Sequence, residues 1–285
     1  MKKISKGEFF IMVFFNRFPG GKKYACTFSY DDGCKQDIRL VQLFNKYGIK
    51  CTFNIPSKGL DNPERPINLG NLKEIYAGHE IASHAYSHPH LNQMGMKQQF
   101  DELIKDREIM EPAWGQIIRG HAYPFGTFDD NTVQALKTAG LVYARTVNSQ
   151  INGFMPPTDF LRWNPTTHHN ESDDAIRRFM YNVEKAPWRA GGLLYIWGHA
   201  YELDNPDAPV QWEQFEAKLK LLSEHEYGIW FATNIEVYDY IQATKAIRIS
   251  ADGKTFYNPT DTDVWVSHGD DDIKIGAMQT VTIED

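Results

Sequence analysis

Two histidines, His84 and His88, stand four residues apart, and Pro89 follows them directly. Residues at positions i and i+4 lie on one face of a single helical turn, so both imidazoles could reach one metal ion at about 2.0–2.1 Å. A carboxylate as third ligand and an open position for water would complete a catalytic metal site. The spacing alone is a weak signal, because such pairs also occur as surface or capping residues. His79 and His90 flank the pair and are alternative ligands with poorer spacing.

Two adjacent carboxylates, Asp31 and Asp32, stand before Gly33 and after an apolar run at residues 24–28. Neighbouring side chains of an extended segment point in different directions, so one carboxylate can bind a metal while the other faces a substrate. Two like charges this close are unfavourable unless a cation or hydrogen bonds offset their repulsion. An ordinary Asp-Asp-Gly turn is the alternative interpretation. The pair therefore gains chemical meaning only in combination with the histidines.

Strand-like and helix-like segments alternate through most of the chain and must position these residues. The expected strands cover residues 24–28, 49–55, 80–83, 116–119, 141–145, 193–197 and 229–232, with a further possible strand at 160–163. The expected helices cover residues 37–47, 71–77, 96–110, 130–139, 173–185 and 212–225. This order is typical of a parallel α/β fold, and about seven repeats predict a closed or nearly closed (β/α)7-8 barrel.

The pattern changes after about residue 246 to short alternating runs with turns, including residues 264–266 and 280–283. We therefore expect a barrel over residues 1–245 and a small β appendage over residues 246–285, packed on the barrel. Near the start of the chain, an apolar run at residues 9–15 follows two lysines. Because Glu8 interrupts the approach and no small-residue cleavage site follows, a first strand is a better prediction there than a signal peptide.

Polar residues with possible chemical roles fall just after the expected strands. They are Asp31 and Asp32 after one strand, His84 after another, Tyr123 after a third and His199 after a fifth. Active sites of β/α barrels lie where the strands end, at their carboxyl ends. Scattered surface residues would not align in this way, so the sequence predicts one shared site built from these positions.

Composition excludes several classes of function. The chain has 285 residues, 42% hydrophobic and 24% charged, which is ordinary for a globular protein with a large core. The formal net charge of −7 argues against a nucleic-acid partner, and no run of 18 apolar residues predicts a transmembrane segment. The only cysteines, Cys26, Cys34 and Cys51, favour reduced thiols and a cytoplasmic protein. A secreted or periplasmic protein that has lost a signal peptide is the alternative.

Four segments together resemble the motifs of the polysaccharide deacetylases, the NodB-homology proteins of carbohydrate esterase family 4. Residues 27–33 (Thr-Phe-Ser-Tyr-Asp-Asp-Gly) resemble the first motif, and residues 84–91 (His-Ala-Tyr-Ser-His-Pro-His-Leu) resemble the second. Residues 123–126 (Tyr-Pro-Phe-Gly) are similar to the end of the third motif, and residues 195–199 (Tyr-Ile-Trp-Gly-His) to the fifth. Order and spacing agree over roughly residues 24–240. The family fold is a distorted (β/α) barrel of about seven strands, which agrees with the expected elements.

The resemblance implies a role for each matching position. Asp32, His84 and His88 would hold a divalent metal, most often zinc in this family; cobalt, nickel or iron would also suit the ligand set. Asp31 would be the general base for the attacking water, and His199 the general acid that protonates the leaving group.

Further roles concern the substrate and the departures from the family pattern. The backbone N–H of Phe125 would help to hold the oxyanion, and Tyr123, Phe125 and Trp197 could form apolar walls for a sugar ring. Trp197 stands where the family usually has leucine, and Phe125 where it has tyrosine. Alanine, at position 122, replaces the arginine that usually orients the base. We expect Arg145 to supply that guanidinium because it ends its own strand, with Arg119 as the alternative.

These expectations describe a metal-dependent hydrolase that removes acetyl groups from an N- or O-acetylated carbohydrate by activating water. Hydrolysis of another small amide is a second possibility. A catalytically silent carbohydrate-binding barrel is a third, but an intact Asp31 and His199 argue against it, since binding needs neither.

Overall fold

The computed structural model describes residues 13–149, 153–185, 191–225 and 228–283. The chain divides into two compact units. The larger unit is Tyr24–Tyr238, and the smaller unit combines Met1–Lys23 with Asp239–Asp285. The division falls within helix α7 (Asn234–Ala246). The boundary expected at residue 245 stays a prediction, and in the structure the C-terminal strands share a unit with the N-terminal segment.

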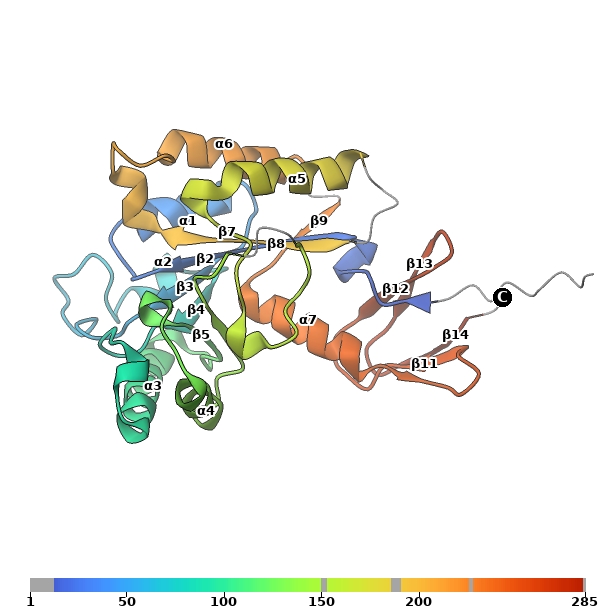
Figure 1. Ribbon diagram of the computed structural model, residues 1–285, viewed down its shortest axis with the longest axis horizontal. Helices are drawn as coiled ribbons and strands as arrows, with labels where there is room; N and C mark the ends of the chain where they lie inside the picture. Colours follow the sequence, from blue (N-terminus) through green and yellow to red (C-terminus); the bar gives the residue numbers. More distant parts are fainter. Residues whose placement is uncertain (1–12, 150–152, 186–190, 226–227, 284–285) are drawn as a thin grey trace, which may run out of the picture. The chain divides into compact units, whose positions relative to one another are not determined.

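A parallel sheet forms the centre of the larger unit (Figure 1). Its strands follow the order β6-β5-β4-β3-β2-β8-β7, and β9 also pairs with β2. All residues of β2 are buried, as expected for a central strand of a parallel sheet. The strands are β2 (Tyr24–Asp31), β3 (Thr52–Ile55), β4 (Glu80–Ser83), β5 (Gly120–Ala122), β6 (Tyr143–Arg145), β7 (Thr167–His168), β8 (Gly192–His199) and β9 (Ile229–Phe231).

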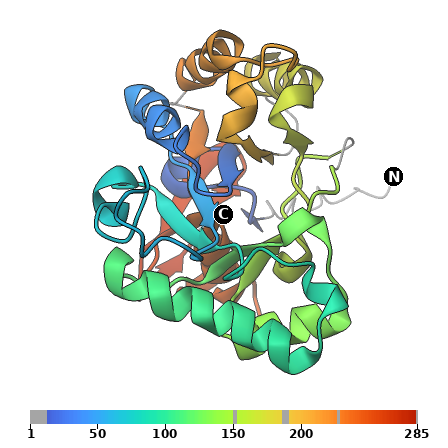
Figure 2. The same cartoon turned by 90° about the vertical axis from the view of Figure 1, so that its left-hand side faces the viewer.

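The two edges of this sheet are joined by the segment at residues 163–168. Trp163 forms a parallel bridge to Arg145 of β6, and its N–H donates to the carbonyl of Ala144 at 2.9 Å. Five residues later, His168 pairs with Trp197 of β8. The segment thus reaches β6 at one edge of the sheet and, as β7, forms the other edge beside β8. The sheet is curled (Figure 2), and the expected distorted (β/α) barrel is confirmed.

Helices cover the outer side of the sheet (Figure 2). In α1 the buried residues Leu40, Val41 and Phe44 lie on one face, and the helix is followed by Gly48 in the left-handed conformation (φ 63°). The ring of Phe44 lies 5.1 Å from that of Phe28 in β2 and 6.0 Å from that of Phe215 in α6. The helices are α1 (Asp37–Lys46), α2 (Leu72–Ile75), α3 (Met96–Trp114), α4 (Asp130–Thr138), α5 (Ser172–Lys185) and α6 (Trp212–Ser223). Within the described part of the chain, no helix is long and apolar enough to span a bilayer.

Some expected strands lie elsewhere or take another form. The strand expected at residues 116–119 begins only at Gly120, because the N–H of Ile118 donates to the side chain of Glu111 instead of to a neighbouring strand (3.0 Å). The possible strand at residues 160–163 is a 3-10 turn, Phe160–Arg162, in which the carboxylate of Asp159 accepts the N–H of Leu161 (2.9 Å). In the apolar run at residues 9–15, the structure has β1 (Val13–Phe14), and residues 9–12 lie outside the described part of the chain.

Among its described residues, the smaller unit has two antiparallel sheets of three strands each, with the orders β1-β12-β13 and β10-β11-β14. A small apolar cluster, which includes Phe256, Val264 and Ile275, forms its own core. The strands expected near residues 264–266 and 280–283 are therefore present. The C-terminal strands are β10 (Arg248–Ile249), β11 (Thr255–Tyr257), β12 (Val264–His268), β13 (Asp271–Ile275) and β14 (Thr280–Thr282).

Candidate metal and catalytic site

The chain turns sharply at the end of β2 and points two successive carboxylates in different directions. Asp31 is the last residue of β2, and Asp32 follows in the left-handed conformation (φ 81°) with its N–H bound to the carbonyl of Asn54 (3.0 Å). Gly33 is also left-handed (φ 58°), and a Cβ there would lie 2.7 Å from Cγ2 of Ile55. Glycine at this position therefore lets the turn pack against β3.

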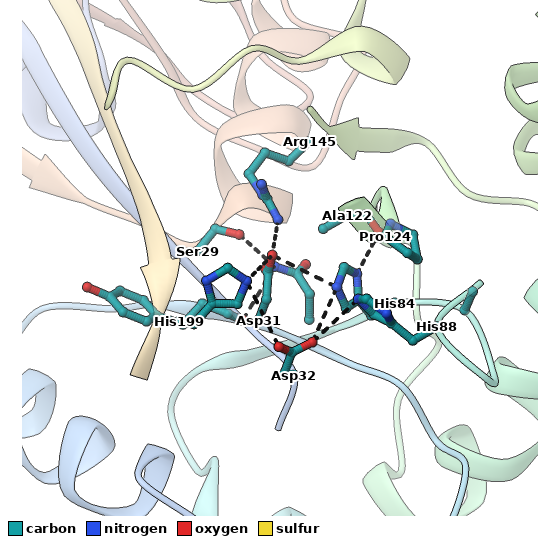
Figure 3. Close-up of polar contacts among 12 residues, drawn as sticks. Ser29, Asp31, Asp32, His84, His88, Ala122, Pro124, Arg145 and His199 are labelled. Atoms are coloured by element: carbon teal, nitrogen blue, oxygen red, sulfur yellow. Dashed lines mark hydrogen bonds and ion pairs between the residues drawn. The ribbon is translucent and has the colours of Figure 1, made fainter. Parts of the chain in front are cut away.

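Asp31 is a buried carboxylate with a fixed orientation, 2% exposed. Its Oδ1 accepts a hydrogen bond from the side-chain amide of Asn54 (2.8 Å), and its Oδ2 forms an ion pair with Nη2 of Arg145 (Figure 3). Burial by itself raises the pKa of Asp31. The opposing effect of Arg145, with smaller ones from His84 and His199, outweighs burial and lowers that pKa below its ordinary value. Asp31 is therefore held ionised and able to accept a proton.

Arg145 is fully buried at the end of β6, and its guanidinium also lies over the ring of Trp197, 4.3 Å from the centroid. The alternative candidate, Arg119, precedes β5 and lines a cavity with Lys50 and Glu236, which lie near the amino ends of the strands. Of the two arginines considered from the sequence, the structure brings Arg145 to Asp31.

Asp32, His84 and His88 bring three possible ligand atoms together. The Oδ1 of Asp32 lies 3.7 Å from Nε2 of His84 and 3.6 Å from Nε2 of His88. Ligands bound tetrahedrally at about 2.0–2.1 Å are themselves about 3.3–3.4 Å apart, so a small contraction would fit a zinc-sized ion. The carbonyl of Ala122 accepts a hydrogen bond from Nδ1 of His84 (2.7 Å), which leaves the lone pair of Nε2 facing Asp32. Burial also lowers the pKa of His84 to about 4, which keeps the imidazole neutral and able to bind a metal.

The loop between the two histidines is not the helical turn expected from their spacing. Ala85 and His88 both have left-handed φ values, 58° and 56°. Helix α3 satisfies the loop's backbone instead: the carboxylate of Glu102 accepts the N–H of Ser87 (2.8 Å), and that of Asp106 accepts the N–H of His84 (3.2 Å). The two imidazoles still meet, with ring centroids 4.6 Å apart, because α3 holds both ends of the loop.

The flanking histidines lie outside this ligand group. His90 stacks on the ring of Phe125 at 3.9 Å. His79 accepts the N–H of Cys51 (3.1 Å) and lies 3.1 Å from the side chain of Asn45, before β4 begins.

The residues expected to form walls for a sugar ring are placed differently from one another. Phe125 is 54% exposed beside the metal-ligand group, with its ring 4.5 Å from that of His88. Tyr123 is buried: its hydroxyl donates to the carbonyl of Leu161 (2.7 Å), and its ring stacks on Phe128 at 4.4 Å. Its side chain packs in the core, so the expectation that it lines a sugar site is corrected. Trp197 is half-buried beneath Arg145.

His199 reaches the same site from the end of β8, where it pairs in register with Asp31. Its Nε2 lies 3.9 Å from Oδ2 of Asp31 and 3.9 Å from Oδ2 of Asp32 (Figure 3). On the other side of the ring, Nδ1 lies 3.1 Å from Oε1 of Glu202. Burial lowers the pKa of His199, but Glu202 and the two aspartates outweigh it and raise that pKa above its ordinary value.

A second group of possible metal ligands lies beside His199 and was missed from the sequence. The Oε2 of Glu202 lies 3.1 Å from Nε2 of His168 and 3.1 Å from Nε2 of His169. The available signals were the adjacent histidines after a short strand and a glutamate three residues beyond His199, and neither belongs to the four motifs.

Comparison with known proteins agrees with this geometry. Residues 19–144 match the family model described as polysaccharide deacetylase. The peptidoglycan deacetylase of Helicobacter pylori is 27% identical over 174 residues, which cover 61% of this chain and 52% of that protein. The match thus spans about half the length of the curated relative.

Two solved structures share the fold. A Mycobacterium smegmatis protein assigned to the polysaccharide deacetylases has a TM-score of 0.58 and 16% identity, covering 80% of this chain and 93% of its own. The Xyl-CE4 domain of a multidomain xylanase, from the hindgut metagenome of Trinervitermes trinervoides, has a TM-score of 0.51 and 15% identity, covering 77% and 92%. At these identities the likeness concerns the fold alone.

Proposed function

This chain is a relative of the polysaccharide deacetylases, and from that premise we propose that it is a metal-dependent hydrolase of the acetyl groups of an N- or O-acetylated carbohydrate. One observation carries the proposal. Asp31 is buried and ionised, and His84, His88 and His199 each have a ring nitrogen within 4 Å of a carboxylate oxygen of Asp31 or Asp32. A barrel that only binds carbohydrate would need none of this arrangement, which argues against the alternative of a catalytically silent binding protein.

Asp32, His84 and His88 are the residues proposed to hold the divalent metal, with zinc as the first choice for two imidazoles and a carboxylate. Bound there, the metal would supply Lewis acidity that polarises the acetyl carbonyl and acidifies the attacking water. The hydrogen bond from His84 to the carbonyl of Ala122 is the kind of outer contact that orients a metal-binding imidazole.

Asp31 is proposed as the general base. Its Oδ1 is bound by Asn54 and its Oδ2 by Arg145, so the carboxylate cannot rotate away from the site. Because Arg145 keeps it ionised, Asp31 can take a proton from water as the oxygen attacks the acetyl carbon. Because Arg145 also stabilises the ionised form, Asp31 is a weak base. It can therefore deprotonate the attacking water only if the pKa of that water is lowered.

His199 is proposed as the general acid. Its Nε2 faces the two aspartates, where the bond to the acetyl carbon breaks, and it can give a proton to the departing nitrogen or oxygen. The backbone N–H of Phe125 is proposed to stabilise the oxyanion from the opposite side, beside His88.

The proposed substrate class follows from the relative and from the rim of the site. The Helicobacter pylori relative is named a peptidoglycan deacetylase, so we propose N-acetylated glycan chains as the first substrates to test. Two exposed aromatic rings, Phe125 (54%) and Tyr201 (44%), stand at the rim beside His88 and His199 and could stack on sugar rings.

We also propose a cytoplasmic location, which three free cysteines support. Fractionation of cells that express the full-length protein tests this location.

Acetate release tests the proposed activity directly. Metal-stripped and zinc-restored protein is incubated with N-acetylglucosamine oligomers, peptidoglycan glycan chains and acetylated xylan, alongside Asp31→Asn. We expect release by the restored wild type only. If the restored wild type releases no acetate from any of these substrates, the deacetylase proposal is wrong. Full activity of the stripped protein would contradict the metal proposal.

A further inference from the structure

Glu202 lies at the centre of three imidazoles contributed by two separate segments. It belongs to the 3-10 segment Ala200–Asp204, directly after His199 at the end of β8. His168 ends β7, and His169 follows it. Three nitrogen atoms lie 3.1 Å from the carboxylate: Nδ1 of His199 from Oε1, and Nε2 of both His168 and His169 from Oε2. Each carboxylate oxygen of Glu202 therefore has its own imidazole partners.

The remaining nitrogens of His168 and His169 indicate where their protons lie. The backbone N–H of Asn170 donates to Nδ1 of His168 (3.3 Å), so the proton of the neutral ring is on Nε2. Nδ1 of His169 lies 3.0 Å from the hydroxyl of Tyr30. Tyr30 is fully buried, so its hydroxyl keeps its proton and can donate it to this nitrogen. Nε2 of His168 then carries a hydrogen beside Oε2 of Glu202, and Nε2 of His169, 3.1 Å from the same oxygen, can carry one as well.

This pattern separates the Glu202 cluster from the group formed by Asp32, His84 and His88. An imidazole that binds a metal through Nε2 carries its proton on Nδ1 and donates it to an acceptor. His84 has such an acceptor in the carbonyl of Ala122. His168 has a donor in that place, the N–H of Asn170. The two groups have similar distances but opposite proton arrangements, so we assign the Glu202 cluster to holding a carboxylate rather than a metal.

The carboxylate of Glu202, held by His168 and His169, fixes the orientation of His199. Oε2 of Glu202 is engaged by two rings from β7 and the turn after it, which leaves Oε1 for Nδ1 of His199. Nδ1 of His199 then keeps its hydrogen on Glu202, and the opposite nitrogen, Nε2, faces Asp31 and Asp32 at 3.9 Å. The contact also ties the segment after β8 to the neighbouring strand.

We propose that Glu202, held by His168 and His169, is the positioning residue that directs Nε2 of His199 toward the leaving group. The inference rests on the proposed function. As the bond from the acetyl carbon to nitrogen or oxygen breaks, the proton on Nε2 moves to the leaving atom and His199 becomes neutral. Its Nδ1–H remains on Glu202 throughout, so Glu202 neither gains nor loses a proton.

A positioning role for a general acid has a signature that depends on the leaving group. An amine leaving from N-acetylglucosamine oligomers needs a proton, whereas the phenolate leaving from 4-nitrophenyl acetate does not. We therefore compare Glu202→Gln with wild type on both substrates, in the zinc-loaded protein. The matched control is Glu216→Gln, which removes a carboxylate that accepts hydrogen bonds from Lys46 and Tyr47 on the outer helices.

We expect Glu202→Gln to lower kcat on the oligomers by about 100-fold, at the lower end of what general acid catalysis contributes, with KM little changed. Activity on 4-nitrophenyl acetate should stay within about threefold of wild type, and Glu216→Gln should match wild type on both substrates. A parallel loss on both substrates, or no loss on either, overturns the inference while leaving the deacetylase proposal intact. A zinc-loaded wild type that releases no acetate from the oligomers, from peptidoglycan glycan chains or from acetylated xylan overturns both.

Two further measurements do not depend on activity. Imidazole 15N chemical shifts should place the proton of neutral His168 and His169 on Nε2, and the other tautomer at His168 would contradict the assignment. Metal analysis should give one equivalent of zinc in the wild type and in Glu202→Gln. Two equivalents in the wild type, falling to one in Glu202→Gln, would identify a second metal site and overturn the positioning role.

Discussion

Replacing Arg145 with methionine should reverse the way in which protein stability depends on pH. In the wild type, Arg145 and Asp31 form a buried ion pair, with side chains 0% and 3% exposed. Arg145→Met keeps most of the side-chain volume but leaves Asp31 buried with only Asn54 as a hydrogen-bond donor. Breaking one side of a buried pair typically costs about 3–5 kcal/mol. Loss of the contact with the Trp197 ring would add about 1–2 kcal/mol.

The sign follows from the two opposing influences on Asp31. In the wild type the pKa of Asp31 is lowered, so its contribution to stability is present above the unfolded pKa, about 3.9, and is lost as pH falls through the folded pKa. In Arg145→Met, burial dominates and raises the pKa of Asp31. Stability of the variant should then decrease as pH rises above about 4, because only the unfolded chain ionises freely.

Denaturant unfolding of metal-stripped protein at pH 5 and pH 8 measures this. We expect Arg145→Met to be destabilised at both values and more strongly at pH 8. In the double variant with Asp31→Asn, the extra loss at pH 8 should disappear, since no buried carboxyl remains to ionise. Arg119→Met is the control for removing an arginine near the sheet and should show no such pH dependence. An equal loss at both pH values, or one below about 1 kcal/mol, would refute the reasoning.

Four other variants test separate parts of the site. Phe125→Ala should lower kcat/KM for acetylated oligomers mainly through KM, without loss of bound zinc. Tyr123→Phe should instead cost about 1–2 kcal/mol of stability in denaturant unfolding and leave KM unchanged. A change in KM for Tyr123→Phe, or a loss of stability without a change in KM for Phe125→Ala, would contradict the burial of Tyr123 and the exposure of Phe125. Gly33→Ala should be destabilised by at least about 1–2 kcal/mol in the same measurement, because φ is positive and the new Cβ would meet Ile55; wild-type stability would contradict this. His84→Ala should lose zinc in equilibrium dialysis, and retention of stoichiometric zinc would place the metal elsewhere.

Much of the site was predictable because its parts are local in the sequence. The Asp-Asp-Gly turn after an apolar run, the histidine pair and the histidine after a second apolar run each occupy a few consecutive residues. The alternation of strands and helices then placed them at the same ends of parallel strands. Arg145 could be chosen over Arg119 for the same reason, since a residue that ends a strand faces the site and one that precedes a strand does not.

What only the tertiary structure decided concerns partners that are distant in sequence. Glu202 meets His168 and His169 because β7 and β8 are neighbours in the sheet, and no short motif records that pairing. Tyr123 is buried because Leu161, far along the chain, supplies an acceptor for its hydroxyl. The loop between His84 and His88 is shaped by carboxylates of α3 rather than by its own helical hydrogen bonds. The sequence determined which residue types stand at the strand ends, whereas the register of the strands and the packing of α3 decided which side chains meet.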